Sequence, residues 1–169
     1  MEEQITTGQV IKKWGIIYGA VAIIVNVTPM LMDIQISWIQ IVNIAIAFAM
    51  FILACKEFRT ENGGLMSFGE GFKISLGAAA IAGVMRSVVV YVYVKFIDTE
   101  YLGRMKEIVN ETWRAQGMSE EQIGQASGFM DGFSSPEVTL ILGVVVVVLG
   151  GLIWGAIVSA IMKNEEDEF

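Results

Sequence analysis

The stretch VTLILGVVVVVLGGLIWGAIVSAIM, residues 138–162, decides the fold class of this 169-residue chain. It contains no charged residue, and a helix needs about 20 mostly apolar residues to cross the hydrocarbon core of a bilayer. An amphipathic helix in water would carry a polar stripe at a period of 3.6 residues, and this stretch has none. The β-branched run 144–148 would favour a strand in water, but an isolated strand in lipid leaves its backbone groups without partners. Residues 138–162 therefore predict a membrane-spanning helix.

Three more apolar blocks precede this one and have the length of membrane spans. They cover approximately residues 14–32, 38–55 and 74–96, and connectors that contain charged residues separate them. The hydrophobic share of 54% also exceeds the share that is usual in soluble domains. We therefore predict an all-α protein in which residues 1–169 form one integral membrane domain, a four-transmembrane-helix bundle.

The connector 98–135 is long enough to have a fold of its own. Apolar residues recur in its first half at three- and four-residue steps, which predicts an amphipathic helix. This helix is expected to begin at Asp98 or Thr99 as its cap and to end at Gly117. Ser119 then begins SEEQ, a capping-box pattern that predicts a second short helix. The third and fourth spans are thus expected to be joined by a helical cap on the extracytoplasmic side.

The connector 56–73, KEFRTENGGLMSFGEGFK, has a different composition. It places four glycines and several large apolar side chains between charged residues. Such a segment either forms a loop anchored at the membrane interface or dips into the membrane. Its glycines do not have the spacing of a phosphate-binding loop.

The positions of lysine and arginine predict the orientation of the chain, because cytoplasmic connectors carry an excess of both. Six such residues fall on one side of the predicted spans: Lys12, Lys13, Lys56, Arg59, Lys73 and Lys163. The opposite side carries basic residues only around the 98–135 connector. Both termini are therefore expected to be cytoplasmic, and no cleavable signal peptide is expected because no small-residue cleavage site clearly follows the first block.

Several function classes are disfavoured by composition alone. The chain has no histidine, which excludes histidine-based acid–base catalysis and His-ligated metal sites, and its single cysteine excludes an internal disulfide. The net charge of −7 argues against a nucleic-acid partner. Paired carboxylates among Glu57, Glu61 and Glu70 could serve acid–base chemistry on a lipid headgroup, but an ordinary solvated interface explains them as well. We expect no catalytic, cofactor-binding or metal-binding residues.

Three groups of motifs resemble a known family. They are KEFR…GG…SFGEGFK, then YVYVKFID…Y, then QGMSEEQI with the proline before the last span. Together they resemble uncharacterised four-span inner-membrane proteins that are common in Bacteroidetes and are catalogued as a domain of unknown function. The resemblance runs from Lys13 to Lys163 and implies a four-span topology and the bacterial inner membrane. It implies no activity and no functional residue.

Small residues at four-residue spacing are expected to bring the helices into close contact, since helices in lipid associate by van der Waals packing. Three pairs stand out: Gly15 and Gly19, Ala79 and Gly83, and Gly151 and Gly155. They predict a compact bundle, and whether one of these faces joins a second copy of the chain stays open.

Arg86 is the one full charge in the interior of the predicted spans. Its Cα is roughly 15 Å from either end of its span, too far for the side chain to reach water fully. Its candidate partners are Asn26, Thr28, Asn43, Tyr93, backbone carbonyls near Pro29, water or an acid on another chain. We expect Asn26, Asn43 and Tyr93 to form an intramembrane polar cluster with the arginine. Three roles are open for Arg86: a structural polar knot, a contact with another subunit, or a site for an anion or a lipid headgroup.

Two functions follow from these patterns. The first is a non-enzymatic inner-membrane scaffold or accessory subunit that acts through helix packing and the outer helical cap, with the bilayer, further copies of the chain or another membrane protein as partners. The alternative is a small oligomeric channel or transporter in which Arg86 favours an anion.

Overall fold

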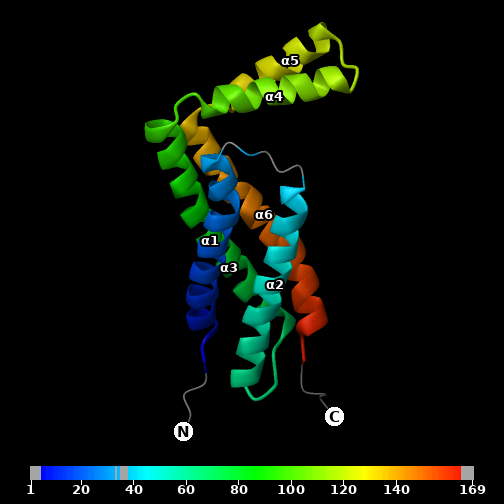
Figure 1. Ribbon diagram of the computed structural model, residues 1–169. Helices are drawn as coiled ribbons and strands as arrows, with labels where there is room; N and C mark the ends of the chain where they lie inside the picture. The colour runs from blue at the N-terminus through cyan, green and yellow to red at the C-terminus, as the bar shows by residue number, and fades with distance from the viewer. Residues whose placement is uncertain (1–4, 33, 35–37, 165–169) are drawn as a thin grey trace. The chain divides into compact units, whose positions relative to one another are not determined.

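The computed structural model describes residues 5–32, 34 and 38–164 of the chain. Every long element is helical (Figure 1): α1 (Thr7–Leu31), α2 (Ile39–Glu61), α3 (Phe68–Val92), the π-helical turn η1 (Tyr93–Ile97), α4 (Tyr101–Ala115), α5 (Glu120–Asp131) and α6 (Pro136–Met162). The described ranges contain no β-strand, and the one isolated bridge joins Met66 to Asn164. The predicted all-α class is confirmed.

The four predicted spans are confirmed as four helices that are long and apolar enough to cross a bilayer: α1, α2, α3 with η1, and α6. Large apolar side chains cover their outer surfaces, with Ile24 66% and Val146 64% exposed. Such exposure is what a lipid-facing surface requires, because a soluble protein rarely shows large contiguous apolar patches. The chain is a multi-pass membrane protein by length and composition.

The helices run further than the apolar blocks that predicted them. α1 begins at Thr7 because the side chain of Thr6 accepts a hydrogen bond from the Gln9 amide in a capping box. α2 continues past the apolar block to Glu61, and α3 begins before its own block at Phe68. The hydropathy pattern that predicted the spans ends at the boundary of the hydrocarbon. Helical hydrogen bonding continues beyond that boundary, so the helices are longer than the apolar blocks.

The 56–73 connector is mostly helical, so the prediction of a loop over its whole length is wrong, whereas its position at the membrane interface stays a prediction. Only residues 62–67 separate α2 from α3, and the backbone turns there through Gly63 and Gly64, whose φ angles are +67° and +88°. Six residues are too few to enter the membrane and return. The remaining glycines of the connector lie in the first turn of α3.

The chain divides into two compact units, one of residues 1–86 with 143–169 and one of residues 87–142. α3 and α6 each have a part in both units. In the first unit, the start of α1, the end of α2, the start of α3 and the end of α6 lie at the same end (Figure 1). All six basic residues that predicted the orientation therefore belong to this end of the first unit.

Side-chain and backbone contacts hold this end of the first unit together. The Lys13 ammonium is 2.6 Å from a Glu57 carboxylate oxygen, and the Trp14 indole N–H donates to the same oxygen at 3.1 Å. The backbones of Met66 and Asn164 exchange two hydrogen bonds of 2.8 Å each. These contacts link α1 to α2, and the α2–α3 turn to the chain just after α6.

Glycines allow close approach of α1 and of α6 to α3. A Cβ atom at Gly15 would lie 2.8 Å from Ile81, and one at Gly19 would lie 2.6 Å from Met85. On the other side of α3, a Cβ at Gly151 would lie 2.5 Å from the Cβ of Ala79. Carbon atoms in contact are normally 3.5–4.0 Å apart, so a larger residue at Gly15 or Gly151 would push the helices apart. At Gly19 the flexible Met85 side chain would have to change its conformation.

Two further small residues lie at the α3–α6 contact. A Cβ at Gly155 would be 2.8 Å from Ser75, and one at Gly83 would be 3.2 Å from Val147. Within the first unit, α3 is thus packed between α1 on one face and α6 on another.

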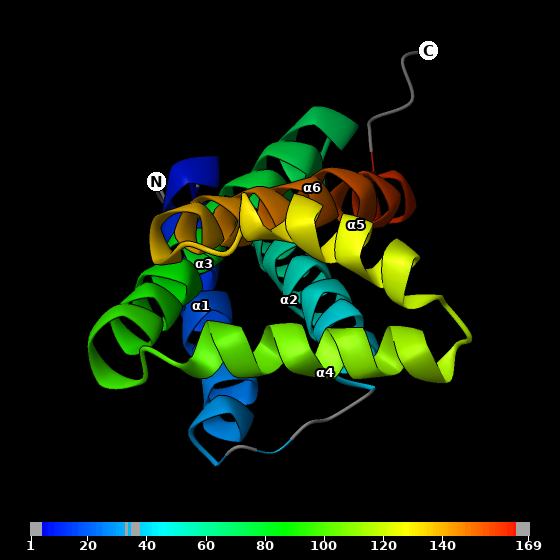
Figure 2. The same cartoon turned by 90° about the horizontal axis from the view of Figure 1, so that it is seen from above.

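The second unit contains a helical hairpin in which α4 and α5 meet at a short turn and contact each other (Figure 2). α4 ends where the Gly117 amide donates to the Arg114 carbonyl and the Met118 amide donates to the Trp113 carbonyl. This pair of bonds is a Schellman motif, which needs the positive φ of +86° that Gly117 adopts. The predicted end of the first helix of the connector at Gly117 is confirmed.

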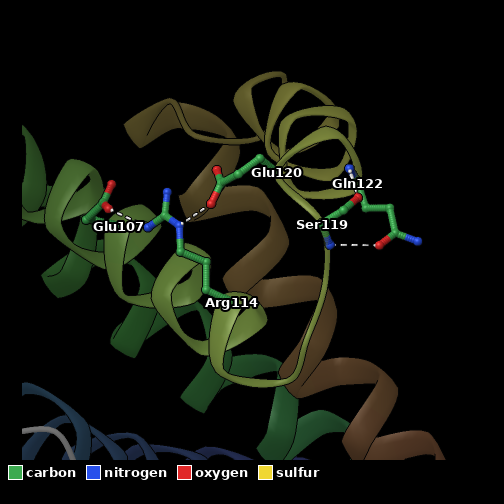
Figure 3. A network of polar contacts seen from close by, with 5 residues as sticks. All are labelled: Glu107, Arg114, Ser119, Glu120 and Gln122. Atoms are coloured by element: carbon green, nitrogen blue, oxygen red, sulfur yellow. Dashed lines mark hydrogen bonds and ion pairs between the residues drawn. The ribbon is translucent and has the colours of Figure 1, made fainter.

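The start of α5 has the predicted capping box (Figure 3). The Gln122 amide donates to the Ser119 hydroxyl at 3.3 Å, and the Ser119 amide donates to the Gln122 side chain at 2.9 Å. Arg114 of α4 reaches across the turn to Glu120 at 2.8 Å and along its own helix to Glu107 at 3.2 Å. The sequence pattern thus predicted the second helix of the connector correctly.

The prediction that Asp98 or Thr99 caps α4 is wrong. The N-cap is Glu100, and its side chain makes no capping hydrogen bond. The Asp98 carboxylate instead accepts hydrogen bonds from the two terminal guanidinium nitrogens of Arg104, at 3.0 and 2.6 Å, and from the Tyr93 hydroxyl at 3.2 Å. The Arg104 guanidinium gives the carboxylate two charge-assisted bonds between full charges, whereas a cap gives it a bond to an uncharged backbone amide, which explains the choice. The same contacts lower the pKa of Asp98.

The ion pair between Arg114 and Glu120 gives a pH-dependent prediction. The hydrogen bond from Arg114 lowers the pKa of the Glu120 carboxyl. The ion pair therefore stabilises the hairpin fully at pH values above the ordinary glutamate pKa of about 4.3, and this stabilisation is lost as the pH falls through the lowered pKa. We expect the Glu120 carboxyl carbon to titrate below about 4.3 in an NMR titration. In Arg114→Gln the titration should move up toward about 4.3, and an unchanged midpoint would mean that the pair does not form.

Candidate functional site: a polar cavity in the first unit

A cavity of about 190 Å³ lies inside the first unit, and all four of its long helices contribute to the wall. The residues around it are Tyr18, Ala22 and Asn26 of α1, Gln40, Asn43, Ile44 and Ala47 of α2, Ala82 and Arg86 of α3, and Val146, Val147, Gly150 and Trp154 of α6. The cavity is therefore a feature of the bundle as a whole.

Two asparagines in this wall form a reciprocal pair between α1 and α2. The Asn26 amide donates to the Asn43 carbonyl oxygen at 2.9 Å, and the Asn43 amide donates back at 3.0 Å. Asn26 uses its second hydrogen on the Ala22 carbonyl at 2.8 Å. The second hydrogen of the Asn43 amide has no acceptor among the described residues, so it is available to a group in the cavity.

Three further residues of the wall can donate hydrogen bonds, and the Gln40 side chain adds both donors and an acceptor. Arg86 is half-buried and contributes a guanidinium with five N–H groups and no acceptor. Within the described part of the chain, neither the Tyr18 hydroxyl nor the Trp154 indole N–H has a hydrogen-bond partner, and both residues line the cavity. No described residue of the wall is acidic. The cavity thus combines one fixed positive charge with several donors and has no carboxylate.

The structure places three of the four residues of the predicted polar cluster around this cavity: Asn26, Asn43 and Arg86. The fourth, Tyr93, belongs to the second unit, where its hydroxyl donates to Asp98. The predicted helix-packing glycines, Gly15, Gly19, Gly83, Gly151 and Gly155, all lie in the first unit and at helix contacts, and Ala79 faces Gly151.

Sequence reasoning did not find Tyr18, Gln40 and Trp154. Tyrosine and tryptophan are common in membrane spans as interfacial or packing residues, so their presence alone carries little information. One pattern could have indicated Tyr18: it is four residues from Ala22 and eight from Asn26, which places all three on one face of α1.

A comparison with known families gives one result. The sequence model of the family described as "Protein of unknown function (DUF4199)" matches residues 13–164. Neither the curated proteins nor the solved structures contain a significant match to the chain.

Proposed function

The chain belongs to this family of unknown function, DUF4199, and because membership assigns no activity, we propose a function from the cavity. The bundle binds an anionic group, carried by a lipid headgroup or by a free anion, and Arg86 supplies the fixed positive charge. In this proposal the protein is a non-enzymatic binding protein. A small oligomeric channel or transporter would use the same site.

One observation carries the proposal: donors and a cation meet in a cavity whose described wall contains no acid. A charge in the interior of a membrane span costs about 2.5–3.5 kcal/mol on insertion scales, so it is rarely present without a partner or a function. An anion in the cavity would accept hydrogen bonds from the guanidinium, from the Tyr18 hydroxyl and from the remaining Asn43 hydrogen. Such charge-assisted hydrogen bonds are about twice as strong as neutral ones.

The proposed location is the bacterial inner membrane, with both termini in the cytoplasm. One observation supports this orientation: six of the basic residues lie at the end of the first unit where α1 begins and α6 ends, and cytoplasmic connectors are generally rich in lysine and arginine. In this orientation the α4–α5 hairpin is extracytoplasmic.

Calorimetry on the purified full-length chain in a neutral detergent tests the proposal. Sodium phosphate and dihexanoyl phosphatidylglycerol are titrated as the two sources of the anion. We expect at least one to bind, Arg86→Gln to raise its Kd about tenfold or more, and Arg86→Lys to retain most of the affinity. Absence of heat with both ligands, or equal Kd values for wild type and Arg86→Gln, would refute the proposal.

A scaffold or accessory role is the second candidate, and the hairpin supports it. Phe129 and Phe133 of the second unit are 73% and 44% exposed, and their rings are only 5.1 Å apart. Exposed aromatic residues of this kind often mark contacts with other proteins. Native mass spectrometry on protein extracted from its own membrane would retain a second copy or another protein if this role holds, and Phe129→Ser with Phe133→Ser should release it.

A further inference from the structure

The cavity wall is open on one side. Three of its residues, Gln40, Ile44 and Val146, are exposed, and they belong to α2 and α6. The wall residues of α1 and α3 are buried or half-buried. The opening therefore lies between α2 and α6.

The residues at the edge of this opening change from polar to apolar along α2. Gln40 is the second residue of α2, whereas Ile44 is one turn further into the span. On the other rim, Val146 lies near the middle of the 27-residue helix α6 and is 64% exposed. Beyond them, Phe48 and Trp154 pack ring against ring at 5.3 Å and join the two helices. This opening, called the slit below, thus has polar Gln40 near the start of α2 and aliphatic Ile44 and Val146 further along the two spans.

The geometry points to an anionic amphiphile as the ligand of the cavity: a lipid or fatty acid whose phosphodiester or carboxylate reaches Arg86 through the slit while its acyl chain stays in the bilayer against Ile44 and Val146. This inference rests on the proposed anion binding and names the class of ligand. Its support is chemical complementarity, because the wall offers donors and a cation to the headgroup, and the exposed Ile44 and Val146 offer aliphatic surface to the chain. A free hydrated anion would gain nothing from contact with these two aliphatic side chains.

The inference is tested in nanodiscs that contain equal amounts of phosphatidylglycerol and phosphatidylcholine, from which the full chain is released into a native mass spectrometer. We expect phosphatidylglycerol adducts to exceed phosphatidylcholine adducts about tenfold, and Arg86→Gln to remove this preference. Val146→Phe narrows the slit and should reduce the adducts about as much, whereas Val145→Phe is the matched control because Val145 is 43% exposed and does not line the cavity.

The outcomes separate this inference from the proposed function. If phosphate binds in calorimetry with Arg86 dependence but nanodiscs yield no preferred phosphatidylglycerol, the site takes free anions and the inference is overturned while the proposed function stands. If neither probe binds, both are overturned. Equal loss in Val146→Phe and Val145→Phe would contradict access through the slit.

Discussion

Replacing Gly151 by alanine is expected to lower the free energy of unfolding by about 1–3 kcal/mol, the usual cost of overpacking a tight contact. The new Cβ atom would lie 2.5 Å from the Cβ of Ala79, and that atom cannot rotate away because alanine has no flexible side chain. α6 and α3 would have to separate along their whole contact. Steric trapping or a denaturant titration in bicelles measures the change.

The chain offers a matched control one residue away. A Cβ at Gly150 would have Trp154 at 3.8 Å as its nearest neighbour, an ordinary contact, so Gly150→Ala should leave the stability unchanged or raise it slightly. A compensating change also exists, since Ala79→Gly combined with Gly151→Ala restores one methyl group to the contact and should recover most of the loss. Equal effects of the two single substitutions would show that α3 and α6 are not packed this closely.

Hydropathy predicted the four spans because lipid demands long apolar helices, and this demand is strong enough to override the strand preference of residues 144–148. It could not predict the ends of α2 and α3. Residues 56–61 and 68–73 are polar enough to lie outside the hydrocarbon, yet they continue the helices because backbone hydrogen bonding favours continuation. Asp98 was misjudged for a related reason: local spacing indicated a cap, but Arg104 offers that carboxylate a stronger partner.

Of the residues that line the cavity, the sequence predicted only those that are most expensive to bury in lipid. Asn26, Asn43 and Arg86 stand out in apolar sequence because each is expensive to bury in lipid, so they had to lie near partners. Tyr18 and Trp154 carry no such signal, because their large apolar rings suit a membrane span in any position. The opening between α2 and α6 depends on the exposure of Ile44 and Val146, which follows from how the helices pack.

Asn26→Leu is expected to lower the free energy of unfolding by about 1–3 kcal/mol, because it leaves the Asn43 oxygen and amide in an apolar bundle without their partner. Replacing both residues by leucine removes the stranded groups, so the double variant should be more stable than the sum of the single effects predicts. The coupling in this double-mutant cycle should be about 1–2 kcal/mol.

The control for the amide pair is Gln40→Leu, which changes an exposed amide of the same wall. Gln40 makes no hydrogen bond with a described residue, so its replacement should change the free energy of unfolding by less than about 0.5 kcal/mol. If Asn26→Leu and Asn43→Leu are each as mild as this control, water in the cavity already satisfies both amides. If the losses of the two single variants simply add in the double variant, the two side chains act independently. That result would contradict the reciprocal hydrogen bonds of 2.9 and 3.0 Å between them.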